Sequence, residues 1–245
     1  MEKNKLIDKN ILKKLIEESD NIVFFGGAGV STASNIPDFR SPTGLYNEKS
    51  EFNYPPEYLL SHSFFVENPK AFTKYYKTKL IYKDAKPNAC HLALTKLEKM
   101  GKLKAIITQN IDSLHQKAGS KNVIEIHGTL RDYYCISCGK TYSEDEILKT
   151  DDLNICECGG IIRPDIVLYE EGLDMDKFSK AINYISNCDL FIVGGTSLAV
   201  YPAAGLLRYY NGNKLVILNM EKTPMDELAD FIYYGDISKI MEDII

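Results

Sequence analysis

The sequence is poor in three features that would each point to a particular class of protein. No apolar run among its 245 residues approaches the roughly 20 residues needed to span a membrane. The first 14 residues mix charged and apolar side chains without a continuous hydrophobic segment, so they do not resemble a secretory signal. The net charge is -5, which argues against a broad basic face for duplex nucleic acid. These absences predict a cytoplasmic globular protein with no direct nucleic-acid or membrane partner. The sequence does not determine the oligomeric state, for which a monomer is the expectation.

Disulfides are not expected either, because the cysteines are clustered rather than spread. Four of the six lie within 24 positions, as two close pairs separated by a 17-residue spacer: Cys135, Cys138, Cys156 and Cys158. Such pairs in a cytoplasmic protein are typical of metal ligands. Four thiolates complete a tetrahedral Zn²⁺ site and leave no position open for water, so we predict a structural zinc and reject a zinc hydrolase. A redox pair is the remaining alternative, and Cys90 and Cys188 are expected as small core residues.

Helix-like and strand-like segments alternate along most of the chain. Short apolar runs end in glycine or polar residues, as expected for strands buried on both faces of a parallel sheet. These runs occupy residues 22–25, 104–107, 189–193 and 214–218. Amphipathic helical patterns cover residues 5–18, 89–100, 176–187 and 202–210. The alternation predicts an α/β fold with a Rossmann-like parallel sheet and right-handed crossovers.

Two stretches interrupt this alternation. Residues 41–86 are rich in proline and aromatic side chains and are expected to be helical, and residues 131–163 hold the four clustered cysteines. We predict that these insertions form a smaller domain, a helical part plus a zinc ribbon, with a cleft between it and the sheet. The Rossmann-like domain would then comprise residues 1–40, 87–130 and 164–245.

Polar or glycine residues follow each predicted strand of the sheet. They are residues 27–31, 109–112, 196–197 and Asn219. The carboxyl ends of parallel strands lie on one edge of a sheet, where open α/β folds bind their ligands. We therefore expect these four segments to converge on one site. The alternative is that they are polar only because they are loops.

The first of these segments is a glycine turn, and a short motif that combines apolar and charged residues follows it. Gly27 and Gly29 would let backbone N–H groups approach a phosphate, although the third glycine of the dinucleotide fingerprint is missing and a tight turn is the alternative. The motif IPDFR follows at residues 36–40. Arg40 is one of only four arginines against 25 lysines, and a guanidinium forks onto phosphate or carboxylate. A surface loop with an internal Asp38–Arg40 pair is the alternative.

His127 is the candidate general base among the four histidines. It ends an alternating, strand-like stretch just before the cysteine-rich insertion, so it would face the cleft at the domain junction. Its ordinary pKa of about 6.5 suits proton transfer near neutral pH. A buried, hydrogen-bonded structural histidine is the alternative, and that interpretation suits His62, His91 and His115 better.

These motifs occur in the order found in sirtuins. The matching segments are residues 27–31 (GAGVS), 36–40 (IPDFR), 108–112 (TQNID), 127–128 (HG), the four cysteines, 195–198 (GTSL) and 235–236 (GD). Over nearly its whole length the chain resembles this family of NAD-dependent protein-lysine deacylases, and specifically the bacterial deacetylases. It departs from the family pattern at Asn35, Ser41 and Ser113, where many members have glycine, and at Gly26, where threonine is frequent.

The resemblance implies a site in which NAD lies across the carboxyl edge of the sheet. The implied NAD contacts are Ala28, Gly29, Thr32, Phe39, Arg40, Gln109, Ile111, Asp112, His127, Thr196, Ser197, Asn219 and Ile237. The implied nicotinamide pocket is Ile36, Asp38, Phe39, Asn110, Ile111 and Asp112, and the implied catalytic residues are His127, Asn110 and Asp112. Residues 166–169 are strand-like, and an acetylated peptide would pair there through Ile166, Val167 and Tyr169, with a core strand as the alternative.

The implied reaction consumes NAD. The acyl-lysine carbonyl oxygen attacks the ribose carbon as nicotinamide leaves, and His127 then deprotonates a ribose hydroxyl. The products are free lysine, nicotinamide and O-acyl-ADP-ribose. Three alternatives stay open from the residues alone: an oxidoreductase on the same sheet edge, a sensor without catalysis, and an enzyme that hydrolyses NAD or transfers ADP-ribose.

The helical insertion bears on the choice of acyl group. Family members that remove acidic acyl groups place a tyrosine and an arginine three residues apart in this region. Tyr75 fits that pattern, but Thr78 stands at the arginine position. Neither Lys77 nor Lys79 would provide a bidentate fork for a carboxylate. The resemblance therefore implies deacetylation in preference to desuccinylation.

Overall fold

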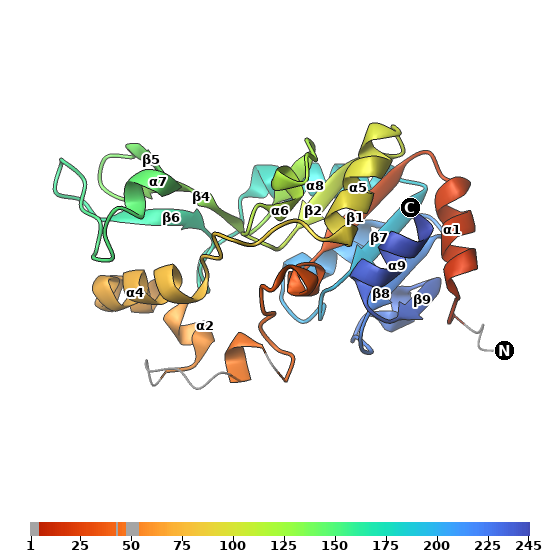
Figure 1. The fold of residues 1–245 in the computed structure, drawn as a ribbon, viewed down its shortest axis with the longest axis horizontal. Helices are drawn as coiled ribbons and strands as arrows, with labels where there is room; N and C mark the ends of the chain where they lie inside the picture. The colour runs from red at the N-terminus through yellow and green to blue at the C-terminus, as the bar shows by residue number, and fades with distance from the viewer. Residues whose placement is uncertain (1–4, 43, 48–53) are drawn as a thin grey trace.

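The computed structural model describes residues 5–42, 44–47 and 54–245 of the protein. Its elements form two parts along the long axis of the molecule (Figure 1). The large lobe is built on a six-stranded sheet, and the small lobe contains a three-stranded sheet. The predicted α/β fold with a second, smaller unit is confirmed.

The sheet of the large lobe is parallel throughout. Its strands, in spatial order, are β3 (Val123–Glu125), β2 (Leu103–Thr108), β1 (Ile22–Gly26), β7 (Leu190–Gly194), β8 (Leu215–Asn219) and β9 (Phe231–Tyr234). All five residues of β1 and all five of β7 are buried, as expected for central strands covered on both faces.

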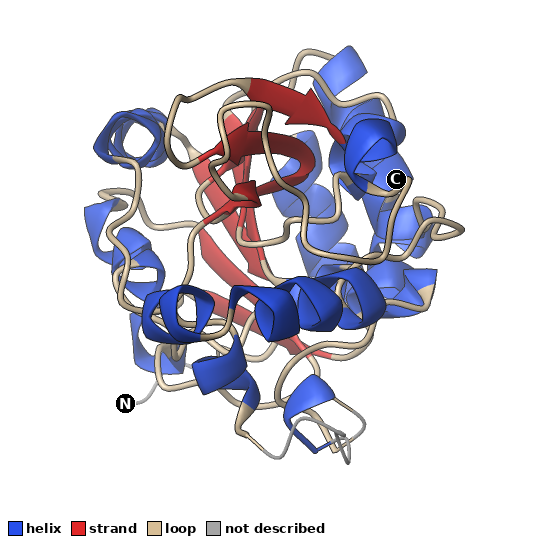
Figure 2. Ribbon diagram, turned by 90° about the vertical axis from the view of Figure 1, so that its left-hand side faces the viewer, coloured by secondary structure: helices blue, strands red, loops and turns tan. Residues whose placement is uncertain are grey.

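Helices cover both faces of this sheet, as a view at 90° also shows (Figure 2). The elements of one face are α1 (Lys9–Glu17), α5 (Ala89–Lys99) and α9 (Ile237–Ile244), and those of the other are α8 (Met175–Asn187) and the 3₁₀ helix η4 (Ala203–Tyr209). Successive residues of β1 point to opposite faces, so Phe24 packs with the first set and Phe25 with the second. Among the described residues, no helix is both long and apolar enough to cross a membrane.

The small lobe combines two segments that are distant in sequence. Its sheet has the order β5 (Thr141–Ser143), β4 (Gly128–Cys135) and β6 (Ile162–Ile166), and its helices are α2 (Pro56–Leu59), α3 (His62–Glu67), α4 (Pro69–Lys79) and α7 (Glu144–Ile147). An aromatic contact joins the two segments: the ring centroid of Tyr76 in α4 lies 6.3 Å from that of Tyr133 in β4. The insertions therefore share one apolar core.

Five short elements complete the described part of the chain. They are α6 (Leu114–Lys117) and the 3₁₀ helices η1 (Ala28–Val30), η2 (Thr32–Ser34), η3 (Leu45–Asn47) and η5 (Asp226–Leu228).

Two predicted helices differ in extent or type. The helix predicted from residue 5 begins at Lys9, because the Asp8 side chain accepts hydrogen bonds from the amides of Asn10 and Ile11. The residues before it run along β9, where the amide of Ile7 donates to the carbonyl of Ile232. The segment predicted as a helix over 202–210 is the 3₁₀ helix η4.

Two strand expectations also change. The predicted strand over 166–169 is regular only at Ile166, where β6 ends, and Tyr169 forms an isolated parallel bridge with Ser61. Strand β9 was not predicted from the pattern. The expected domain boundaries after residues 130 and 163 fall inside β4 and β6, which pair with each other. The division into domains stays a prediction, and its boundaries would have to lie outside these two strands.

Candidate active site

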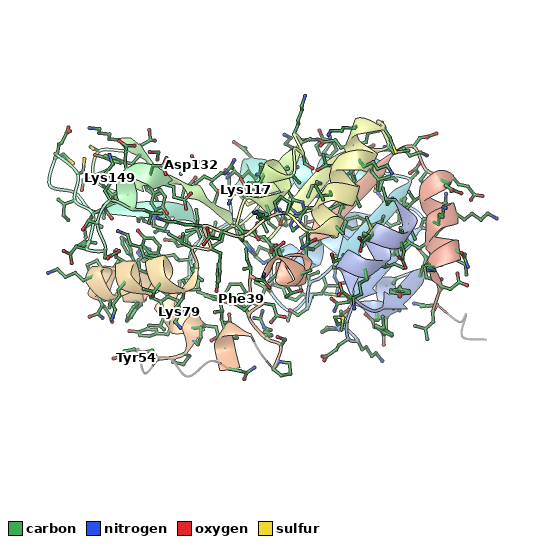
Figure 3. The ribbon with its side chains drawn as sticks, viewed as in Figure 1. Phe39, Tyr54, Lys79, Lys117, Asp132 and Lys149 are labelled. Atoms are coloured by element: carbon green, nitrogen blue, oxygen red, sulfur yellow. The ribbon has the colours of Figure 1, made fainter. Side chains whose placement is uncertain are left out.

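The carboxyl ends of β1, β2, β7 and β8 open into a cavity of about 970 Å³ between the lobes. This cavity is lined by all the residues predicted above as site residues: the NAD contacts, the nicotinamide pocket, the catalytic residues and the peptide contacts. Phe39 projects between the two lobes (Figure 3). The four strand ends therefore converge as expected, and polarity at these positions marks one site rather than unrelated loops.

The glycine turn after β1 packs directly against the turn after β7. A Cβ atom added at Gly27 would lie 2.7 Å from the Thr196 Cβ, and one at Gly29 would lie 2.9 Å from the Gly195 Cα. The amides of Gly27 and Gly29 already donate to the carbonyls of Gly194 and Gly195. Close approach of two loops, rather than exposure of these two amides, therefore accounts for the glycines.

A hydrogen-bonded chain links the turn after β1 to the turn after β2. The Asn110 side-chain amide donates to the Ser31 hydroxyl over 3.0 Å, and that hydroxyl donates to the Asp112 carboxylate over 2.6 Å. The second Asp112 oxygen accepts from the amide of Leu114. This chain fixes the orientation of Asn110 and Asp112 at the cavity wall.

His127 is held at the same edge by a backbone carbonyl. Its Nδ1 lies 3.2 Å from the carbonyl oxygen of Gln109, which can only accept, so Nδ1 carries the proton. The neutral ring then keeps Nε2 unprotonated. Burial lowers the pKa of His127 below its ordinary 6.5, and the hydrogen bond to Gln109 opposes only part of that shift. The ring is therefore a neutral proton acceptor at pH 7.

Gln109 and Thr196 tie this edge together across two strands. The Thr196 hydroxyl donates to the Gln109 side-chain oxygen over 2.8 Å, while the Gln109 carbonyl holds His127. Both residues were predicted as NAD contacts. In the structure their hydrogen bonds also connect the turn after β7 to the turn after β2 and to His127.

The IPDFR motif forms a turn above the cavity. One Asp38 carboxylate oxygen accepts from the amides of Arg40 and Ser41, at 3.0 and 2.8 Å. The Arg40 guanidinium lies over the Tyr46 ring, 5.2 Å from its centroid, and the Phe39 ring packs on the same tyrosine with centroids 5.6 Å apart. Asp38 thus shapes the loop, and the aromatic face of Tyr46 supports the two side chains predicted to cover NAD.

An ion pair positions the segment after β6. The buried Arg163 guanidinium forks onto both oxygens of Glu171, at 2.5 and 3.0 Å. Glu171 also accepts from the amide of Leu168, while the amide of Val167 donates to the carbonyl of His127. These bonds hold the residues that follow Ile166, where the regular strand β6 ends.

Two departures from the family pattern have a physical explanation. Asn35 and Ser113 adopt left-handed backbone conformations, with φ of 63° and 62°. Glycine is the usual residue there because it has no Cβ to clash with the backbone. Asparagine tolerates this region well, and Ser113 is further held by its hydroxyl, 3.2 Å from that of Thr129.

Sequence reasoning missed some cavity residues. Ser31 lies in the recognised GAGVS segment but was not assigned the bridging role that the structure gives it. Glu221 lines the cavity beside Asn219, whose side-chain amide donates to the Glu221 carbonyl. Tyr46 also lines the cavity, and no spacing or composition signal marks it out.

The four cysteines predicted as metal ligands come together in the small lobe, away from the cavity. Their sulfur atoms all lie within 4.8 Å of one another, with Cys135–Cys158 at 3.5 Å and Cys138–Cys156 at 3.6 Å. Zn–S bonds of about 2.3 Å at tetrahedral angles place sulfurs about 3.8 Å apart, so the donor set fits zinc. The Tyr142 hydroxyl donates to the Cys156 sulfur over 3.0 Å, which would support a coordinated thiolate.

Comparison with known proteins gives one consistent family. Residues 27–202 match the model of the Sir2 family. A curated NAD-dependent protein deacetylase from Clostridium acetobutylicum is 55% identical over 98% of this chain and 99% of its own, and one from Clostridium tetani is 58% identical over 96% of each. A solved structure of Sir2 with p53 peptide and NAD⁺ is 39% identical and superposes with a TM-score of 0.85 over 97% of the chain.

Proposed function

The chain belongs to the Sir2 family and is an NAD-dependent protein deacetylase, and we propose that His127 is its general base. The carrying observation is the hydrogen bond from His127 to the Gln109 carbonyl, which leaves Nε2 as the acceptor in the cavity. Its lowered pKa keeps the ring neutral at physiological pH. A neutral imidazole at the carboxyl edge of the sheet can take a proton from a ribose hydroxyl bound there.

NAD is the co-substrate, and we propose that it lies along the strand ends with its pyrophosphate near Gly29 and Ser197. When bound, NAD supplies a ribose carbon whose bond to nicotinamide can be broken. Asn110 and Asp112 would hold the nicotinamide end, because the Ser31 bridge fixes both side chains before any ligand arrives. A preorganised carboxylate near a developing positive charge lowers the barrier without further rearrangement.

At the adenosine end, Asn219 would hydrogen-bond the ribose and Ile237 would pack on the base. Both line the same cavity as His127. Phe39 and Arg40 would close over the nicotinamide end and exclude water from the reacting atoms.

The acetylated peptide is proposed to enter beside Ile166, Val167 and Tyr169. The amides of Val167 and Tyr169 already donate within the protein, to the carbonyls of His127 and Leu60. A peptide strand here would therefore pair through the carbonyl of Val167, because those of Leu168 and Tyr169 accept from the amides of Glu171 and His62. Recognition through main-chain groups predicts weak dependence on peptide sequence.

Acetyl is the proposed acyl group. Tyr75 is buried, and Thr78 is exposed with its hydroxyl donating to the carbonyl of Lys74 on its own helix. The Lys77 ammonium points into the small lobe, where its partners include the carbonyl of Thr150 at 2.7 Å. None of these side chains offers a guanidinium fork to a succinyl carboxylate.

The test is incubation with NAD and an acetyl-lysine peptide, followed by mass spectrometry of peptide and nucleotide. We expect deacetylated peptide, nicotinamide and O-acetyl-ADP-ribose in equal amounts, and slower turnover of a succinyl-lysine peptide. His127→Ala should lower deacetylation by about 10²–10⁴-fold with an unchanged zinc content. Tyr209→Phe, at an exposed tyrosine that does not line the cavity, is the control. Plain ADP-ribose with untouched peptide would instead indicate an NAD hydrolase.

We also propose that the enzyme acts in the cytoplasm as a monomer, without direct nucleic-acid or membrane contact. The net charge of -5 argues against duplex nucleic acid, and the lack of a disulfide among the six cysteines suits a reducing compartment. Light scattering after size-exclusion chromatography tests the monomer, since a mass near 55 kDa, about twice 27.7 kDa, would contradict it.

A further inference from the structure

Two tyrosine hydroxyls meet across the mouth of the cavity. The Tyr46 and Tyr169 oxygens lie 2.7 Å apart, although the residues are 123 positions apart in the chain. Tyr46 belongs to η3, and Tyr169 belongs to the segment after β6. Both line the cavity. The bond therefore joins the loop proposed to cover NAD to the segment proposed to hold the peptide.

On one side of this bond, Tyr46 is tied to the NAD-covering loop at several points. The amide of Leu45 donates to the carbonyl of Asp38, and that of Tyr46 donates to the carbonyl of Phe39. The Tyr46 ring packs against the Phe39 ring at an interplanar angle of 63° and lies under the Arg40 guanidinium. Any shift of Tyr46 is consequently passed to Phe39 and Arg40.

On the other side, the Tyr169 backbone is fixed while its side chain remains partly open. Its amide donates to the carbonyl of Leu60, and its carbonyl accepts from the amide of His62. The residue is 36% exposed, so a bound peptide can contact its ring. The backbone thus serves as a fixed anchor, and the side chain is the element that a peptide can order.

We propose that the Tyr46–Tyr169 hydroxyl pair couples binding of the acetylated peptide to binding of NAD. Both tyrosines are positioning residues: peptide contact orders the Tyr169 ring, its hydroxyl holds Tyr46, and Tyr46 holds Phe39 and Arg40 over the nicotinamide end. The inference rests on the proposed function of these loops. Coupling of this kind is reciprocal, so NAD tightens peptide binding by the same factor.

The chemistry of the pair suits this task. Burial, together with the hydrogen bond to Tyr169, raises the pKa of Tyr46, so its hydroxyl stays protonated at working pH. Each hydroxyl can then donate or accept. A phenylalanine at either position removes the bond and keeps the ring, which makes the pair suitable for a double-mutant cycle.

The experiment measures the dissociation constant of carba-NAD, whose ribosyl–nicotinamide bond is not cleaved, with and without saturating acetyl-lysine peptide. The proteins are the unsubstituted enzyme, Tyr46→Phe, Tyr169→Phe and the double variant. Tyr209→Phe, an exposed tyrosine on η4 that does not line the cavity, is the matched control. Unfolding midpoints and zinc content verify that each protein is folded.

We expect the peptide to tighten carba-NAD binding about tenfold in the unsubstituted enzyme and in Tyr209→Phe. The factor should fall to about twofold in each single variant and no further in the double variant, because one bond is lost in all three. A tenfold factor in every variant, or single effects that multiply in the double variant, would overturn the proposal. Tyr169→Phe alone decides the matter should Tyr46→Phe fail to fold.

Deacetylation of the same peptide with NAD separates this inference from the proposed function. An unsubstituted enzyme that leaves the peptide acetylated contradicts the proposed function. An enzyme that deacetylates but shows equal coupling in all variants contradicts only the role of the tyrosine pair.

Discussion

The large and small lobes are stabilised in different ways. In the large lobe, continuous apolar strands lie between two layers of helices, and fully buried side chains such as Phe24 and Phe191 fill both interfaces. The small lobe has one apolar core, and it adds a four-thiol cluster and single polar anchors such as Lys77 and the Arg163–Glu171 pair. The large lobe should therefore tolerate the loss of any one polar contact, whereas the small lobe should not. Because the cavity lies between them, activity depends on both.

Removing the metal should produce the largest difference in stability between the two lobes. Structural zinc sites contribute about 10–16 kcal/mol in small peptides, which is comparable to the whole stability of a domain. We expect chelation or Cys156→Ser to unfold β4 and β6 and abolish deacetylation, while β1 and β7 stay protected from hydrogen exchange. Cys188→Ser, a buried cysteine in the large lobe, is the control and should retain the metal. Equal loss of hydrogen-exchange protection in both lobes would contradict the conclusion that the two lobes are stabilised in different ways.

Lys77 tests the polar anchors of the small lobe. Its ammonium lies within hydrogen-bond distance of four acceptors, the carbonyls of Ile147, Thr150 and Asp152 and the Asn154 side chain. Burial lowers its pKa, opposed by nearby aspartates. Lys77→Met should cost about 1–3 kcal/mol in urea unfolding and speed proteolysis between residues 147 and 154. Lys70→Met, an exposed lysine of the same helix, should change neither, and an equal effect of the two would show that the anchor contributes nothing.

The smallest expected effect concerns acid sensitivity in the large lobe. His115 is buried, and neither of its ring nitrogens has a partner among the described residues. Burial, and to a smaller degree His91, lowers the pKa of His115 well below 6.5. Below pH 6.5 the unfolded chain therefore binds a proton that the folded protein does not, so stability falls as pH falls.

Replacing His115 by a residue that cannot be protonated should remove its contribution to the pH dependence of stability. On going from pH 7.5 to pH 5, His115→Phe should gain about 1–2 kcal/mol relative to the unsubstituted protein in urea unfolding. Phe24→Leu, which alters the ring packed against His115, should change stability by the same amount at both pH values. A pH-independent difference for His115→Phe would show that its protonation is not linked to folding.

Sequence patterns were most informative where they reflected a repeated physical requirement. Strands β1, β2, β7 and β8 of the large lobe were located to within a residue or two, because burial on both faces requires uninterrupted apolar runs. The cysteine ligands followed from spacing, since only a few local geometries bring four thiols together. The segment 166–169 was misjudged, because its amides pair with His127, Leu60 and Glu171, partners that no local pattern reveals.

The amino-acid sequence alone determined the α/β class, the four thiols and the set of residues that meet at the sheet edge, because each depends on periodicity, spacing or motif order. Only the tertiary structure decided the tautomer of His127, the Ser31 bridge and the Tyr46–Tyr169 contact. Each of these depends on distances between segments far apart in the chain. Such distances are set by how the two lobes pack, and not by the residues beside each partner.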